Sequence, residues 1–255
     1  MSGATGVMAI ILLETAAGGA ALLWASGVWG VVRRGFFLLT GTTITLCAAG
    51  AWAITRAEAA ATPATDRAVT ALAVFTVFAV VWQLLLAFRQ EAASRVAGLA
   101  ATAAGAVALL LFAGVRGRAV GLGLMELVMG ALFLGSTLYG LLLGHWYLVE
   151  RRLPNTHMVR SAWLYAGGVL AAGVGALLSA RNPAPEAASL SPLLAVPSFT
   201  LLLAGGFVAI CALIAPFVWK LAHEGGRSIQ AATGYFYLAV IMAFTAEMAA
   251  KLRWF

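Results

Sequence analysis

The sequence predicts an all-α integral membrane protein with eight transmembrane helices, arranged as two four-helix bundles. Three observations predict this fold: the composition, eight apolar runs of membrane-spanning length, and landmark residues that recur between the two halves of the chain. Of the 255 residues, 63 % are hydrophobic and 10 % are charged, compared with about 45–50 % and about 25 % in an ordinary soluble domain. This composition excludes a soluble enzyme, a nucleic-acid-binding domain and a disordered chain.

The apolar runs are each long enough to cross a bilayer, which requires about 20 residues per helix. Basic residues or prolines interrupt the sequence between them. We expect the spans at residues 7–30, 35–55, 68–88, 96–115, 121–149, 159–180, 195–219 and 231–250. No basic segment precedes the first run, so we expect it to be retained and not cleaved as a signal peptide. All loops are short, so a large water-soluble substrate would require a partner subunit.

Landmarks of the first span recur in the fifth at one constant offset. The matched pairs are Gly18 with Gly135, Gly27 with Gly144, and Trp29 with Trp146. Each half also closes with two basic residues one position apart, in the runs Arg116-Gly-Arg118 and Lys251-Leu-Arg253. A duplication would make residues 1–118 and 119–255 two parallel halves of four helices each. Chance matches among abundant glycines, with the usual arginines at helix ends, are the alternative explanation.

Three acidic residues lie inside the spans, where burial of a charge costs several kcal/mol and therefore suggests a function. Glu14 lies in the first span, Glu126 near the start of the fifth and Glu247 near the end of the eighth. The spans' directions put all three toward the face that carries the termini. Buried carboxylates can exchange protons near neutral pH, as a quinol site or a proton-coupled carrier requires. The alternative is a structural role in ion pairs, such as Glu247 with Lys251 at i,i+4.

Aromatic residues and histidines provide weaker candidates. His145, Tyr139 and Tyr235 could contact a quinone. The favoured alternative for the tyrosines is packing against lipid or the core, and for His145 it is a place in an interfacial belt. A bis-histidine haem is not favoured, because His145 has no second histidine within a span, and no spacing indicates a metal site. Tryptophans near span ends fit an interfacial belt: Trp24, Trp29, Trp163, Trp219 and Trp254.

The closing run Phe244-Thr-Ala-Glu247-Met-Ala-Ala-Lys251-Leu-Arg253-Trp-Phe255 resembles the ends of membrane-anchor subunits of the dimethyl sulfoxide reductase and polysulfide reductase type. The resemblance implies two four-helix bundles, no required haem, and oxidation of quinol or reduction of quinone with electrons passed to an iron–sulfur or cytochrome partner. The residues that such anchors use in their early spans are not recognisable here. The run Gly144-His145-Trp146-Tyr147 is similar to runs in uncharacterised bacterial membrane proteins, which implies no activity.

The leading functional hypothesis is therefore a quinone-interacting subunit of a respiratory complex in the bacterial inner membrane, surrounded by lipids and without a nucleic-acid partner. A small-solute or proton-coupled transporter is the first alternative, and a structural or assembly subunit is the second. Loops on one face hold nine lysines and arginines, compared with seven on the face of the termini. The positive-inside rule then places both termini outside.

Overall fold

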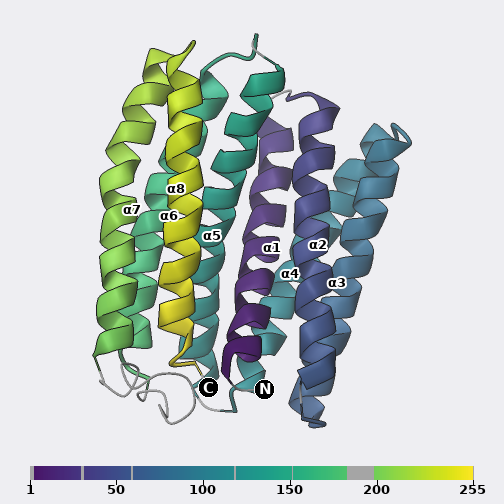
Figure 1. The fold of residues 1–255 in the computed structure, drawn as a ribbon. Coiled ribbons are helices and arrows are strands. Elements are labelled where there is room, and N and C mark those ends of the chain that lie inside the picture. Colours follow the sequence, from purple (N-terminus) through teal and green to yellow (C-terminus); the bar gives the residue numbers. More distant parts are fainter. Residues whose placement is uncertain are drawn as a thin grey trace.

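The computed structural model describes residues 3–29, 32–58, 60–117, 119–150, 152–182 and 198–254. It confirms the all-α fold, because the described residues form eight membrane-length helices. Their bounds are α1 Gly3–Trp29, α2 Arg34–Glu58, α3 Pro63–Ala87, α4 Glu91–Val115, α5 Val120–Val149, α6 Thr156–Ser179, α7 Phe199–Glu224 and α8 Ser228–Lys251. The helices run alternately up and down, and both ends of the chain lie at the same face (Figure 1). We call it the terminus face.

Several helices extend beyond the apolar runs that predicted them. The segment around Pro63 was expected to be a loop, yet α3 begins there. Proline suits the first position of a helix, where its missing N–H costs nothing. Thr62 and Thr65 also cap the free N–H groups of this end reciprocally. The seventh span was expected from residue 195, but residues 183–197 lie outside the described part of the chain, and α7 begins at Phe199.

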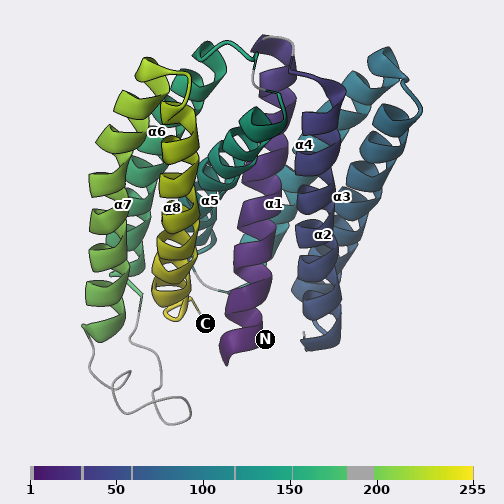
Figure 2. The ribbon, with the colours of Figure 1, turned by 45° about the horizontal axis from the view of Figure 1, so that its top comes forward.

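Each half of the chain packs as its own group of four helices. In the first half each helix contacts the next and α4 returns to α1; in the second half α8 returns to α5 in the same way. The two groups meet where α1 packs beside α5, as two views show (Figures 1 and 2). In α1 and α5, 78 % and 72 % of the most apolar stretch is buried, compared with 22–44 % in the other helices. The packing agrees with a duplication, which stays a prediction.

Glycines allow α1 and α5 to approach closely at their crossing. A Cβ atom on Gly18 would collide with the main-chain oxygen of Ala131, and one on Gly135 would collide with the main chain of Gly18. Small residues at such crossings let helix backbones touch in a membrane, where packing drives association. Gly18 and Gly135 are also the matched landmarks of the two halves. The crossing therefore brings equivalent positions of the halves together.

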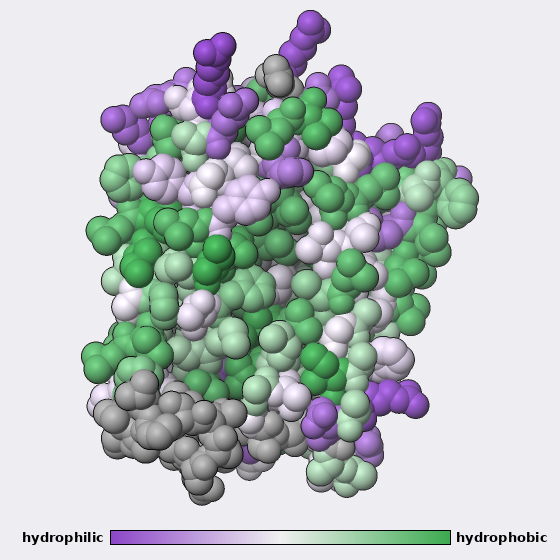
Figure 3. All heavy atoms as spheres, viewed as in Figure 1, coloured by the Kyte–Doolittle hydropathy of each residue, from purple (hydrophilic) through white to green (hydrophobic). Residues whose placement is uncertain are grey.

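On the face seen in Figure 3 the surface is mostly apolar around its middle, and hydrophilic residues gather at the top and at the lower right. Large apolar side chains on α6 and α7 are exposed and would meet lipid: Leu170, Leu177, Leu202 and Leu213 are between 68 % and 74 % exposed. Pro216 lies within α7 without ending the helix. This surface fits a multi-pass membrane protein, in which lipid covers the outward side chains.

Because main chain faces main chain at the crossing, Gly135→Leu should separate α1 from α5 and destabilise the fold by about 1–3 kcal/mol or more. We expect a lower melting temperature of the detergent-solubilised protein, followed by fluorescence-detected size exclusion after heating. Gly173→Ala is the matched control, because a Cβ atom at Gly173 would meet nothing within 4 Å. Equal melting temperatures for the two variants would contradict the close crossing.

Candidate functional site

The structure brings together the three intramembrane acids expected from the sequence. Glu14 lies in α1, Glu126 in α5 and Glu247 in α8, three helices that contact one another. All three are buried, with at most 4 % of each residue exposed. Glu14 lies eleven residues after Gly3, or roughly 16 Å along the helix axis. The expected gathering toward the terminus face is therefore confirmed, while a functional role for these residues stays a prediction.

Lys251, the last residue of α8, joins the three acid-bearing helices. Its ammonium Nζ lies 2.9 Å from Glu14 Oε1 and 3.5 Å from Glu247 Oε2. It also donates a hydrogen bond of 3.0 Å to the main-chain oxygen of Glu126. Lys251 is only 3 % exposed, so these contacts replace water. The i,i+4 pair with Glu247 was expected, whereas the closer contact with Glu14 comes from the packing of α8 against α1.

Glu126 is held by a second set of partners. Arg116 Nη1 lies 3.3 Å from Glu126 Oε1. Asn182 donates through Nδ2 to both carboxylate oxygens at 3.1 Å, and its own Oδ1 accepts from Arg116 Nη2. Arg116 reaches this position because the chain turns sharply after α4, with Gly117 and Ala119 both at positive φ. Glu126 is thus fixed by a charged partner and a neutral one.

Trp254 forms one wall of this cluster. It was expected in an interfacial belt, but the structure contradicts that expectation, because Trp254 is fully buried. Its ring lies 4.9 Å from the Arg116 guanidinium and 5.6 Å from Lys251 Nζ. The turn after α8 carries it inward, with the main-chain N–H of Trp254 donating to the main-chain oxygen of Lys251 at 3.0 Å. Nearby, Arg253 donates through Nη2 to the main-chain oxygen of Asn182 at 2.6 Å.

Together these residues form what we call the buried ion network: Glu14, Glu126, Glu247, Arg116, Lys251, Arg253, Asn182 and Trp254. The network holds three acids and three bases, so its formal charges balance. The balance is uneven locally, because Glu14 and Glu247 share the single ammonium of Lys251. Glu14 Oε2 makes no hydrogen bond with the described residues, and the Glu14 carboxylate lies directly against Gly130.

The ion pairs also cross between the two halves in a reciprocal way. Lys251 closes the second half and binds Glu14 of the first half. Arg116 closes the first half and binds Glu126 of the second half. The sequence indicated the pair of Lys251 with Glu247, but not the contacts of Lys251 with Glu14 or of Arg116 with Glu126. Arg118, the other basic residue that closes the first half, lies outside the described residues.

The aromatic and histidine candidates do not join the ion network. They lie 12 to 19 residues from the acid of their own helix, which is roughly 18–28 Å along the axis. Tyr139 packs edge-on against Phe36, and Tyr235 stacks on Phe217. His145 is exposed, with Tyr237 Oη 3.4 Å from its Nδ1. Among the described residues, no group of three His, Cys, Asp or Glu is placed to hold a metal ion.

Two members of the network, Asn182 and Trp254, were not predicted from the sequence to lie beside the buried acids. Asn182 follows α6 in a loop, where asparagine is a common residue and suggests no particular role. Its contact with Glu126 depends on how that loop packs. Trp254 looked like one more interfacial tryptophan. A signal for both was their position: each lies within two residues of an arginine or lysine at the terminus face, close to where the buried acids were expected.

Removing Lys251 should leave two buried carboxylates without their cation. Loss of one partner of a buried ion pair costs about 3–5 kcal/mol, so Lys251→Met should strongly lower the melting temperature. The triple variant Glu14→Gln, Glu247→Gln and Lys251→Met removes all three charges and should recover much of that loss. Lys220→Met, which changes an exposed lysine at the opposite face, is the control. A triple variant as unstable as Lys251→Met would contradict the pairing.

The chain has no match among protein-family models, curated proteins or solved structures. The resemblance of its closing segment to quinone-interacting anchor subunits therefore stays a prediction. That segment nevertheless supplies Glu247, Lys251, Arg253 and Trp254, which are half of the buried ion network.

Proposed function

We propose that the protein is an integral membrane subunit of an electron-transfer complex, in which Glu14 and Glu247 exchange protons with a quinol or quinone. The observation that carries the proposal is the sharing of one ammonium, that of Lys251, by two fully buried carboxylates. One proton bound to this pair would cancel the excess negative charge. A buried site whose net charge stays close to zero when it binds or loses one proton is suited to a reaction that releases protons.

Quinol oxidation releases two electrons and two protons. In this proposal the pair of Glu14 and Glu247 accepts the two protons one after the other, and releases the first toward the terminus face before it takes the second. Lys251 keeps both acids in place during each transfer. Glu247 lies one helical turn from the end of α8, whereas Glu14 lies eleven residues into α1. A proton therefore has a shorter path to the terminus face from Glu247 than from Glu14. Apart from the connection between α6 and α7, most of which lies outside the described residues, the loops contain at most six residues between helices. We therefore assign the electrons to a partner subunit with an iron–sulfur or haem group.

The test is quinol-linked electron transfer in membranes that contain the partner subunits. Glu14→Gln and Glu247→Gln should each lower turnover by about a hundredfold or more, the usual contribution of a proton-transferring group. Both variants should still insert, because glutamine keeps the shape of the side chain. Glu58→Gln changes an exposed acid at the same face and should leave turnover unchanged. Full turnover in both buried variants would end the proposal.

A structural role is the second candidate, favoured by the balanced charges and by the reciprocal pairs between the halves. Buried ion pairs can fix one arrangement of helices without adding much stability. In that case Glu14→Gln and Glu247→Gln would reduce assembly with partner subunits, measured by copurification. The turnover of each complex that does assemble would be normal. Turnover per assembled complex therefore distinguishes the two candidates.

The exposed cations support an outer location of the terminus face. At the opposite face eight described lysines and arginines are exposed: Arg33, Arg34, Arg89, Arg95, Arg152, Arg160, Lys220 and Arg227. At the terminus face only three described ones are exposed: Arg56, Arg67 and Arg181. The others there that the structure describes are buried in the ion network. Because exposed cations favour the cytoplasmic side, we propose that the network lies toward the outside of a bacterial inner membrane.

This orientation predicts the behaviour of fusions at the C-terminus. Alkaline phosphatase fused there should be active, because that enzyme folds only outside the cytoplasm, and green fluorescent protein fused there should be dark. A fusion after Arg89, in the connection between α3 and α4, should give the reverse pattern. A fluorescent C-terminal fusion with inactive phosphatase would contradict the proposed orientation.

A further inference from the structure

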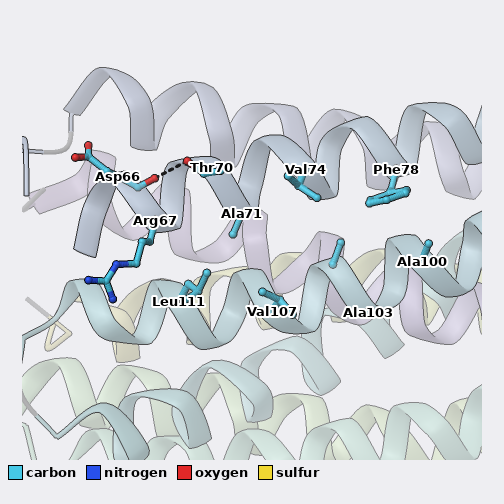
Figure 4. A pocket seen from close by; sticks show the side chains of 11 residues that line it. Asp66, Arg67, Thr70, Ala71, Val74, Phe78, Ala100, Ala103, Val107 and Leu111 are labelled. Carbon is cyan, nitrogen blue, oxygen red and sulfur yellow. Dashed lines mark hydrogen bonds between the residues drawn. The ribbon is translucent and has the colours of Figure 1, made fainter. Parts of the chain in front are cut away.

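A groove runs along the outer surface between α3 and α4, and none of its lining residues belongs to the ion network. Its volume is about 660 Å³. Polar residues lie at one end, and apolar side chains follow along the seam between the two helices (Figure 4). The polar end lies in the first turns of α3, at the terminus face. The groove therefore extends from the membrane surface into the hydrocarbon layer.

Small residues on α4 create the hollow. Ala100, Ala103 and Ala104 line one wall, and the longer side chains Val74 and Phe78 of α3 line the other. Val74 and Phe78 are 43 % and 38 % exposed, so the groove opens outward toward lipid. A flexible hydrocarbon chain can fill such a seam and gain the packing contacts that the alanines leave open.

The polar end presents one acid and one base side by side. Asp66 and Arg67 are both exposed, and their side chains point in different directions (Figure 4). No ion pair joins either side chain to another described residue. Thr70 binds only the main-chain oxygen of Asp66. The two charges are thus available to a ligand, and together they sum to zero.

We propose that this groove binds a phospholipid with a phosphoethanolamine headgroup, with one acyl chain in the seam. Arg67 would bind the phosphate, since a guanidinium suits phosphate oxygens. Asp66 would accept hydrogen bonds from the headgroup ammonium. A phosphatidylglycerol headgroup has no cation for Asp66, and a choline headgroup has no N–H to donate. The complementarity of charge therefore selects the ethanolamine lipid, independently of the proposed electron transfer.

The test uses the full-length protein, purified in detergent and mixed with one defined lipid at a time. Phosphatidylethanolamine, phosphatidylcholine and phosphatidylglycerol with identical acyl chains are compared by native mass spectrometry. We expect one tightly retained molecule of phosphatidylethanolamine and weaker retention of the other two. Equal retention of all three lipids by the unaltered protein would overturn the assignment of the headgroup.

Variants locate the site. Arg67→Gln should weaken retention of phosphatidylethanolamine about fivefold, the loss expected for one interfacial arginine. Asp66→Asn should remove the preference for phosphatidylethanolamine over phosphatidylcholine, and Ala103→Leu should reduce retention of every lipid by filling the groove. Arg56→Gln and Glu58→Gln are the matched controls, because they change an exposed base and acid at the same face outside the groove.

The melting temperatures of all variants should match that of the unaltered protein, because the changed side chains are exposed. Retention that is unchanged in Arg67→Gln and Ala103→Leu would overturn the site. Retention lost equally in Arg56→Gln would also overturn it, because binding would then depend on surface charge in general and not on the groove.

Discussion

The ammonium of Lys251 is the contact on which the architecture depends, because it binds groups from three helices and both halves of the chain. Glu14, Glu247 and the main chain of Glu126 all lie within 3.5 Å of it. In a membrane there is little hydrophobic force between helices, since lipid is as apolar as the side chains. Close packing at Gly18 and Gly135 brings α1 and α5 together. The ion network then fixes the position of one half relative to the other along the membrane normal.

The sequence predicted the fold well because span length and composition are local properties. Eight apolar runs predicted the eight helices that the described residues form. The helix ends differed, as at Pro63, where a proline expected in a loop starts a helix. The direction of each span then placed Glu14, Glu126 and Glu247 at one face. Alternation of direction needs no knowledge of which helices touch. The grouping of the three acids toward one face therefore followed from the number and alternating direction of the spans alone.

The remaining part of the site depends on contacts between distant segments, which no local pattern encodes. Lys251 lies four residues from Glu247 in the sequence, so that pair was visible. Its shorter contact with Glu14 joins residues 237 positions apart and depends on how α8 packs against α1. Asn182 and Trp254 were missed for the same reason. Each is ordinary in its own segment and becomes distinctive only beside Glu126, Arg116 and Lys251.

The separation of Glu14 from Lys251 along the chain has a consequence for biosynthesis. Chains are made from the N-terminus, so Glu14 and Glu126 reach the membrane before Lys251 exists. During that interval Glu14 has none of its final cation, and an unpaired charge at this depth is costly. Until α8 is inserted, Glu14 must therefore either carry a proton or lie near the lipid headgroups. The contact of Lys251 with Glu14 is therefore made last, after α1 and α5 are both in the membrane.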